Sequence, residues 1–268
     1  GLRQIPLLDD NGKLISVEFS EQLLSKRKPN WVVLMVGGLG SRLGEITQST
    51  PKPLLPVGDK PLLETIIQNF INQGFNKFFL SVNYKADMFR KYFGDGSKMG
   101  VEIQYLEEPT RLGTAGSLSL LPELPKEPFF VMNGDLLTNI NFEQMLRFHQ
   151  ETRSDATMCV REYDLQVPYG VVRLDPQQLI TAIDEKPVQK FFVNAGIYLL
   201  NPEALGYVPG EKTFDMPSLF LEMISKSKKT TAFPIREYWL DIGRLDDLEK
   251  AQGEIVHLFS ETSIRAGK

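Results

Sequence analysis

The sequence predicts an α/β protein built on a Rossmann-like, doubly wound mixed sheet, and three observations support this. Apolar runs typical of buried strands alternate with segments of helical spacing through the first half of the chain. Polar or glycine-rich stretches follow several of these runs directly. Beyond residue 155, short strand-like segments predominate, which predicts a mixed insertion that completes the sheet and forms one wall of a cleft.

The elements of the first half alternate regularly. We expect strands at residues 31–36, 77–83, 101–108 and 128–133, and helices at 61–75, 85–94, 114–124 and 141–153. Pro61 stands where a helix begins, and Gly74 and Gly94 stand where helices end. Ligands of such sheets bind beyond the carboxyl ends of the strands, so the polar residues there are the candidates for chemistry.

The second half has fewer helices. Strands are expected at residues 156–163, 169–175, 179–187, 191–201 and 230–235, and helices at 216–228 and 244–259. Cys159 falls in an alternating strand pattern, which favours a buried apolar role. His149 and His257 lie in helical stretches away from every motif, and we interpret both as surface or packing residues.

The first 29 residues have a different character. Residues 2–19 predict a β-hairpin around Asn11-Gly12, and residues 20–30 predict a linker after a short helical segment. Because the chain begins at Gly1, we expect a piece of a longer protein. The predicted organisation is therefore an upstream remnant at 1–29, a main domain at 30–255 and a tail at 256–268.

Composition limits the classes of partner. A formal net charge of -4 argues against nucleic acid. A single cysteine excludes an internal disulfide and a cysteine-built zinc site, and it fits a reducing, cytoplasmic compartment. No apolar run approaches about 18 residues, so no membrane span and no membrane partner are expected.

A glycine-rich loop follows the first long strand, and such a loop alone is weak evidence. Gly37, Gly38 and Gly40 let a ligand approach the backbone closely. No Gly-Lys-Ser/Thr follows, and position 43 is a leucine, so neither the Walker nor the dinucleotide pattern fits. Arg42 and Lys52 add two cations suited to a polyphosphate; the alternative is a solvated pair around a tight turn.

Acidic residues stand at other strand ends. Asp135 and Asp241 follow apolar strands, where two carboxylates suit a Mg²⁺ that bridges phosphates; each alone could be a cap or turn residue. Glu185 and Lys186 end another strand and could bind sugar hydroxyls and a phosphate, or form an exposed ion pair.

Six motifs in order resemble the sugar-1-phosphate nucleotidylyltransferases, also called nucleoside-diphosphate-sugar pyrophosphorylases. They are GGLGSRL…PKPLLPVGDKP, LGTAGSL, NGD, EKP, NAG and WLDIG, spread over about residues 30–253. The resemblance implies the nucleotide-diphospho-sugar transferase fold with a strand-rich sugar-binding half. It also implies that a nucleoside triphosphate and a sugar 1-phosphate give an NDP-sugar and pyrophosphate. The segment GEITQST departs from the family pattern, and there we expect only a local loop change.

The resemblance also implies roles for particular residues. Arg42 would hold the leaving pyrophosphate, and Lys52 the α-phosphate. Asp135 and Asp241 would ligate Mg²⁺, Glu185 would hold sugar hydroxyls, and Lys186 the sugar phosphate. The remaining implied contacts are with the nucleotide (Gly37, Gly38, Gly40, Ser41, Glu108, Gly113 and Thr114) and with the sugar (Gly134, Asn194 and Gly196).

The base is expected to be read near Gly113, five residues after Glu108. A carboxylate only accepts hydrogen bonds, and guanine offers two adjacent donors, whereas uracil and thymine would set a carbonyl against it. GTP is therefore favoured, with UTP, dTTP and CTP as alternatives. The other possibility is that Glu107 or the backbone reads the base while Glu108 faces solvent.

The sugar cannot be read from the sequence. Mannose 1-phosphate is the commonest substrate for this motif set. Residues 2–17 resemble the last hairpin of a CBS domain, which also occurs before glucosamine-1-phosphate guanylyltransferases, so an amino sugar is a second candidate. Many relatives dimerise, and a homodimer is possible. A non-catalytic paralogue would lack some of these residues, and an NAD-dependent oxidoreductase would need the full glycine fingerprint.

Overall fold

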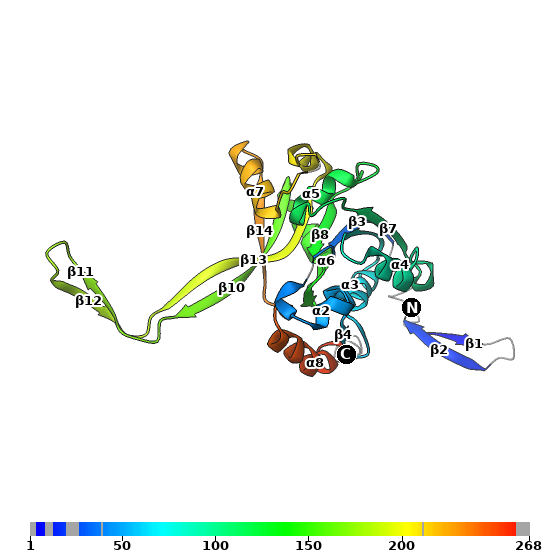
Figure 1. The fold of residues 1–268 in the computed structure, drawn as a ribbon, viewed down its shortest axis with the longest axis horizontal. Coiled ribbons are helices and arrows are strands. Elements are labelled where there is room, and N and C mark those ends of the chain that lie inside the picture. Colours follow the sequence, from blue (N-terminus) through cyan, green and yellow to red (C-terminus); the bar gives the residue numbers. More distant parts are fainter. Residues whose placement is uncertain (1–3, 9–12, 20–26, 39, 211, 261–268) are drawn as a thin grey trace.

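The computed structural model describes residues 4–8, 13–19, 27–38, 40–210 and 212–260. A seven-stranded sheet in the order β14-β10-β13-β8-β3-β6-β7 forms its centre, as Figure 1 shows. Its strands are β3 (Lys28–Met35), β6 (Phe75–Val82), β7 (Glu102–Glu107), β8 (Phe129–Asn133), β10 (Ala156–Gln166), β13 (Val188–Leu200) and β14 (Thr230–Ile235). Only β13 runs antiparallel to its neighbours within this sheet, which confirms the expected mixed, mostly parallel sheet.

Helices cover both faces of the sheet, as expected of a doubly wound fold. One face carries α3 (Leu62–Ile71), α4 (Ala86–Phe93), α6 (Phe142–Thr152) and α8 (Leu245–Ser260). The other carries α5 (Gly113–Gly116), η4 (Ser117–Leu120), η5 (Pro202–Tyr207) and α7 (Met216–Ser225). The expected helix at 114–124 is instead two short turns, because Gly113 and Gly116 bound the first turn and Pro122 falls inside the expected range.

Alternation along the strands sends side chains into two separate cores. Val32 and Leu34 of β3 join one core, whereas Val33 joins the other. Aromatic rings fill the first: Phe70 of α3 stacks on Phe142 of α6 with centroids 3.7 Å apart. Burial on both faces explains why β3 is continuously apolar between Trp31 and Val36.

The order of the strands creates a switch point beside β3. From β3 the chain proceeds to β6 and β7 on one side, then returns to β8 on the other. The loops that follow β3 and β8 therefore diverge and leave a crevice at their carboxyl ends. Two small pairings complete this edge: β4 (Pro56–Val57) with β5 (Lys60–Pro61), and β9 (Leu136–Thr138) with β15 (Trp239–Asp241).

A long two-stranded arm, residues 161–193, projects from the body (Figure 1). Its shaft is the outer part of β10 paired with the outer part of β13, and its tip is β11 (Val171–Leu174) paired with β12 (Ile180–Asp184). The expected cleft wall is therefore wrong for this segment: β10 and β13 do complete the sheet, but β11 and β12 extend away from it.

The ends of the chain refine the predicted boundaries. The expected hairpin is present as β1 (Gln4–Leu8) paired antiparallel with β2 (Leu14–Phe19). Asn11-Gly12 and most of the expected linker lie outside the described residues. At the other end, α8 continues to Ser260, so the predicted boundary at 255 falls inside a helix. No helix in the described part of the chain has the length and apolar character needed to cross a membrane.

Two interpretations of buried residues are confirmed. Cys159 is fully buried and free, and burial raises the pKa of its thiol. His149 is also buried, with its ring nitrogens 2.7 Å from Thr157 Oγ1 and 3.0 Å from Asn201 Oδ1. The side chain of His257 lies outside the described part of the structure.

Candidate active site

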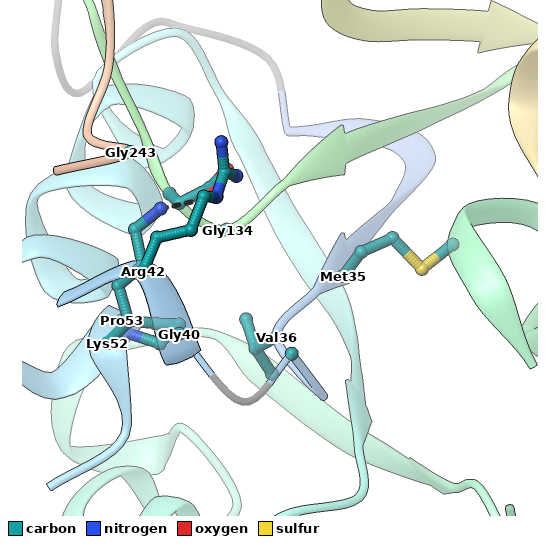
Figure 2. Close-up of a pocket in the computed structure, with 10 residues that line it drawn as sticks. Met35, Val36, Gly40, Arg42, Lys52, Pro53, Gly134 and Gly243 are labelled. Atoms are coloured by element: carbon teal, nitrogen blue, oxygen red, sulfur yellow. Dashed lines mark hydrogen bonds and ion pairs between the residues drawn. The ribbon is translucent and has the colours of Figure 1, made fainter. Parts of the chain in front are cut away.

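A pocket of about 200 Å³ lies at the switch point, where the loops after β3 and β8 diverge. Figure 2 shows Arg42 and Lys52 directed toward Gly134 and Gly243 across this pocket. Its lining is largely polar and comes from four parts of the chain: Met35, Val36, Gly38, Gly40 and Arg42; Lys52 and Pro53; Gly134 and Asp135; and Gly243.

Lys52 lies at the centre of the charged groups. It occupies η2 (Lys52–Leu54) between two prolines, and only 7% of its side chain is exposed. Its Nζ lies 2.7 Å from Asp135 Oδ2 and 4.0 Å from Asp241 Oδ1. A buried ammonium needs such compensation, so the two carboxylates fix where this cation sits.

The pairing of β9 with β15 brings the two carboxylates together. Asp241 stands opposite Leu136, the residue after Asp135, and Ile242 N donates to Asp135 O at 3.1 Å. Residues more than a hundred positions apart thereby meet at one edge of the pocket. The sequence predicts that both acids follow strands, but not that β15 pairs with β9.

The negative charge of Asp241 is only partly compensated. Burial, followed by the negative charge of Asp135, raises the pKa of the Asp241 carboxyl, against the opposing effect of Lys52 and Arg42. Its Oδ1 is buried and accepts no hydrogen bond. A divalent cation would relieve both features, and Mg²⁺ is commonly held by one or two carboxylates together with phosphate oxygens. Among the described residues, no three His, Cys, Asp or Glu side chains gather into a fuller metal site.

Arg42 approaches the pocket from η1 (Ser41–Leu43). A Cβ placed on Gly243 would lie 3.4 Å from Arg42 Nη1 and 3.5 Å from Asp247 Oδ2, so the guanidinium lies over this glycine. Asp247 Oδ2 accepts hydrogen bonds from Gly243 N and Arg244 N and thereby orders the turn into α8. In the described part of the chain Arg42 has no ion-pair partner, which leaves its charge for a ligand.

Glycines in the lining allow the loops around the pocket to pack closely. Gly40 has φ +63°, and a Cβ there would lie 2.9 Å from Thr47 Cγ2. At Gly134 a Cβ would come within 2.5 Å of Val36 Cγ1. The two loops thus pack tightly on each other beneath the pocket. Leu39 and the side chain of Ser41 lie outside the described residues.

Glu108 lies beside the glycine loop, with both carboxylate oxygens engaged. Ser81 Oγ donates to Oε1 at 2.6 Å, and Leu112 N donates to Oε2 at 2.9 Å. A Cβ on Gly37 would lie 2.9 Å from Oε1. The carboxylate is therefore fixed in orientation beside Gly37, and each oxygen retains one further lone pair.

The predicted nucleotide residues Gly113 and Thr114 are held by the start of α7. Thr114 N and Oγ1 both donate to Asp215 Oδ1, and Met216 N donates to Thr114 Oγ1. Gly113 has φ +79°, and a Cβ there would lie 2.7 Å from Phe214 O. Neither residue lines the pocket at the switch point.

Asn194 and Gly196 form a bulge at the base of the arm, beside the pocket. The register between β10 and β13 shifts here, and Asn194 turns its side chain toward Tyr198 Oη and Gly196 N. A Cβ on Gly196 would lie 2.8 Å from Asn133 Nδ2. Asn133 Oδ1 is buried without a partner, which marks it as an additional candidate that the NGD motif contains but the sequence argument passed over.

Glu185 and Lys186 are not brought to the pocket. Both are exposed on the arm, between the end of β12 and the start of β13, where the tip joins the shaft. Lys186 has φ +46°, in the left-handed region. Counting along β13 at 3.3 Å per residue, Lys186 lies roughly 25 Å from Asn194 at the base of the arm.

Comparison with known proteins places the chain among nucleotide-transferring proteins. Residues 31–257 match the family described as nucleotidyl transferase. The chain is 34% identical over 222 residues to the mannose-1-phosphate guanylyltransferase catalytic subunit beta of Drosophila melanogaster, which spans 80% of this chain and 60% of that protein. The chain thus spans about 60% of the length of that curated relative.

Solved structures show the same fold. HddC from Yersinia pseudotuberculosis superposes with a TM-score of 0.66 and 26% identity, covering 84% of this chain and 99% of HddC. A second HddC structure, complexed with GMP-PN, superposes with a TM-score of 0.66 and 25% identity, again over 84% and 99% of the two chains.

Proposed function

The chain belongs to the nucleotidyl transferase family, and on that premise we propose that it transfers a nucleoside monophosphate from a nucleoside triphosphate to a sugar 1-phosphate. GTP is the favoured donor. An oxygen of the sugar phosphate attacks the α-phosphorus, the bond from that phosphorus to the bridging oxygen breaks, and pyrophosphate leaves. The products are an NDP-sugar and pyrophosphate.

One observation carries this proposal: Arg42, Lys52 and Asp135 line one pocket at the switch point, and Asp241 adjoins them. Transfer of this kind requires positioning and charge neutralisation more than covalent chemistry. Lys52 is the group next to the attacked α-phosphate, held in place by Asp135 at 2.7 Å. Arg42, which has no carboxylate partner in the described structure, binds the leaving pyrophosphate.

Asp135 and Asp241 are the proposed ligands of Mg²⁺. The buried Oδ1 of Asp241, which accepts no hydrogen bond, and the mutual repulsion of the two acids fit a divalent cation at this point. Bound there, the ion supplies positive charge against the phosphate oxygens.

The preference for GTP has two supports. The chain is similar to a mannose-1-phosphate guanylyltransferase and to HddC, of which one structure contains GMP-PN. In addition, Glu108 is a carboxylate oriented by Ser81 and Leu112, and its remaining lone pairs can accept from guanine N1–H and N2–H₂. The acceptor is a sugar 1-phosphate, with mannose and an amino sugar as the candidates to try first.

A pyrophosphate-release assay tests the whole proposal. ATP, GTP, CTP, UTP and dTTP are each offered with a panel of sugar 1-phosphates, with Mg²⁺ and with chelator. The expected result is Mg²⁺-dependent release that is fastest with GTP. Equal or faster release with UTP or dTTP would remove the argument from Glu108. Absence of release with every pair would remove the proposed activity.

A further inference from the structure

The arm exposes more apolar surface than any other part of the described molecule. Of the seventeen large hydrophobic side chains that are exposed, eleven lie on it or at its tip: Tyr163, Leu165, Tyr169, Val172, Leu174, Leu179, Ile180, Ile183, Val188, Phe191 and Phe192. Four of the eleven are aromatic and about half exposed or more, and an aromatic side chain can bury roughly 150–250 Å². A standard protein interface covers about 800 Å² per partner, so these side chains can contribute a large part of one.

Tyr163, Leu165 and Phe191 share one face of the shaft, whereas Val188 and Phe192 lie on the other face beside the ion pair of Lys190 with Glu162. Opposite residues of an antiparallel pair share a face, so Tyr163 lies beside Phe191 on the shaft. At the tip, Val172 lies opposite Ile183, and Leu174 opposite Ile180, all between 48% and 64% exposed. A two-stranded ribbon is only marginally stable alone, and exposed apolar patches of this size mark interaction surfaces.

The pocket, in turn, lacks a cation for the second substrate. Lys52 is paired with Asp135 and lies near Asp241, which leaves Arg42 as the unpaired cation among the lining residues. A nucleoside triphosphate together with a sugar phosphate brings several negative charges. Lys186 is exposed and, in the described structure, presents a free ammonium on the arm, with its backbone in the left-handed region at φ +46°.

Lys186 cannot reach the pocket of its own chain with the arm as it stands. The base of the arm lies close to Asn133, the residue before the pocket-lining Gly134, and the arm projects away from the body (Figure 1). Continuous pairing of β10 with β13 from Val160 to Gln166 holds the shaft straight, so folding back would break this ladder. Delivery to a second copy needs no such change.

We propose that the arm of each chain packs its apolar faces on a second copy of this chain and brings Glu185 and Lys186 to that copy's pocket. Each site is then assembled from two chains, with Lys186 binding the phosphate of the sugar 1-phosphate. The inference rests on the proposed function for the role of Lys186. The docking itself is inferred only from the exposed apolar surface of the arm.

Complementation between two inactive variants tests the delivery. Lys186→Gly removes the cation and relaxes the positive φ, so the fold is retained. Asp135→Asn damages the pocket but leaves the arm intact. Co-expressed with different tags and purified as the mixed dimer, the two chains should regain about half the wild-type rate, because one of the two sites is intact. A mixed dimer that stays inactive would overturn delivery in trans.

A matched control pairs two pocket lesions. Asp135→Asn mixed with Asp241→Asn should recover nothing, since no pocket in that dimer is intact. Recovery in this control would overturn the inference, because it would show that activity does not depend on which chain supplies the arm.

Sedimentation velocity tests the docking without any activity. The wild-type chain should sediment as a dimer at micromolar concentration, and Tyr163→Ser combined with Phe191→Ser should shift it to the monomer. A monomeric wild type would overturn the docking. If the wild-type dimer forms but releases no pyrophosphate with any substrate pair, the proposed function fails while the docking stands.

Discussion

At the scale of single residues, the site depends on one buried cation between two acids. Lys52 is 6% exposed and has its ion pair with Asp135 at 2.7 Å. A cation is required at position 52: the charge of Lys52 compensates the two carboxylates, whereas a neutral residue there would leave them to repel each other. Each acid therefore contributes both to the placement of Lys52 and to the proposed metal site.

Replacing Asp135 with asparagine tests the catalytic half of this arrangement. Asp135→Asn keeps the size of the side chain but removes the charge that would hold Mg²⁺ and orient Lys52. We expect kcat to fall on the order of a hundredfold or more, because charge stabilisation by the metal is weakened. Steady-state pyrophosphate release measures it. Asp246→Asn, an exposed acid in the first turn of α8, is the matched control and should retain full activity; near-normal turnover of Asp135→Asn would take Asp135 out of the site.

Asp241 gives a prediction that needs no substrate. Because burial and Asp135 raise its pKa, the ionised carboxylate is unfavourable in the folded protein. Its contribution to stability is therefore most favourable at low pH and worsens as the pH rises through the raised pKa. In metal-free buffer at pH 7, Asp241→Asn should have a higher Tm than the wild type.

Millimolar Mg²⁺ should reverse this order. The ion binds the folded wild type and raises its Tm, whereas the variant has lost one carboxylate and should respond less. Differential scanning fluorimetry with and without EDTA measures both. Equal responses to Mg²⁺ in the two proteins would contradict the assignment of Asp241 as a ligand.

At the scale of elements, the sequence predicts most reliably those features that depend on one strand or helix alone. The strand at β3, its glycine loop and the acid after β8 were each predictable from apolar runs that end in polar residues. Asp241 was placed after a strand, but its meeting with Asp135 depends on β15 pairing with β9, three residues on each side. Strands this short leave little periodic signal.

The arm shows where the sequence is least informative. Its strands were expected, and so was the charged pair Glu185 and Lys186 at the end of one of them, but not that these strands would project away from the body. Alternation specifies which residues share a face but does not say whether that face meets the body or a different molecule. Eleven exposed hydrophobic residues look like core positions in the sequence and lie at the surface of the single chain.

His149 connects α6 to β10 and to the end of β13, and it gives this region a dependence on pH. Burial lowers the pKa of the imidazole, with Asn201 and Asp155 opposing. The stabilisation is therefore fully present above about pH 6.5 and is lost as the pH falls through the lowered pKa. Thermal melts between pH 7.5 and pH 5 should show His149→Gln losing less Tm on acidification than the wild type.

The second histidine provides the control for this experiment. The chain has two histidines, so His257→Gln should keep the wild-type dependence on pH if His149 is responsible. If instead His257→Gln lost the dependence of Tm on pH and His149→Gln kept it, the pH effect would come from His257, and the prediction for His149 would be wrong.

At the scale of the whole molecule, the fold separates two tasks. The sheet and its helices hold Arg42, Lys52, Asp135 and Asp241 around one crevice, each fixed by elements with buried cores. Along residues 161–193, all within the described part of the chain, the arm contains no buried residue and projects away from the body (Figure 1). An exposed ribbon with apolar faces is a liability for a solitary chain, whereas it is a stabilising contact for an assembled one.

Assembly of each site from two chains predicts that specific activity depends on protein concentration. On dilution below the dissociation constant of the dimer, each pocket loses the Lys186 of its partner, so the rate per chain should fall in parallel with the dimer fraction. Tyr163→Ser weakens the shaft interface and brings this transition into an accessible range. Mass photometry at each dilution supplies the dimer fraction against which the rate is compared.

Adding excess Asp135→Asn chain, which donates an intact arm, should restore the rate of the dilute enzyme, whereas Asp135→Asn combined with Lys186→Gly should not. A rate per chain that stays constant while the dimer fraction falls would show that each chain completes its own site.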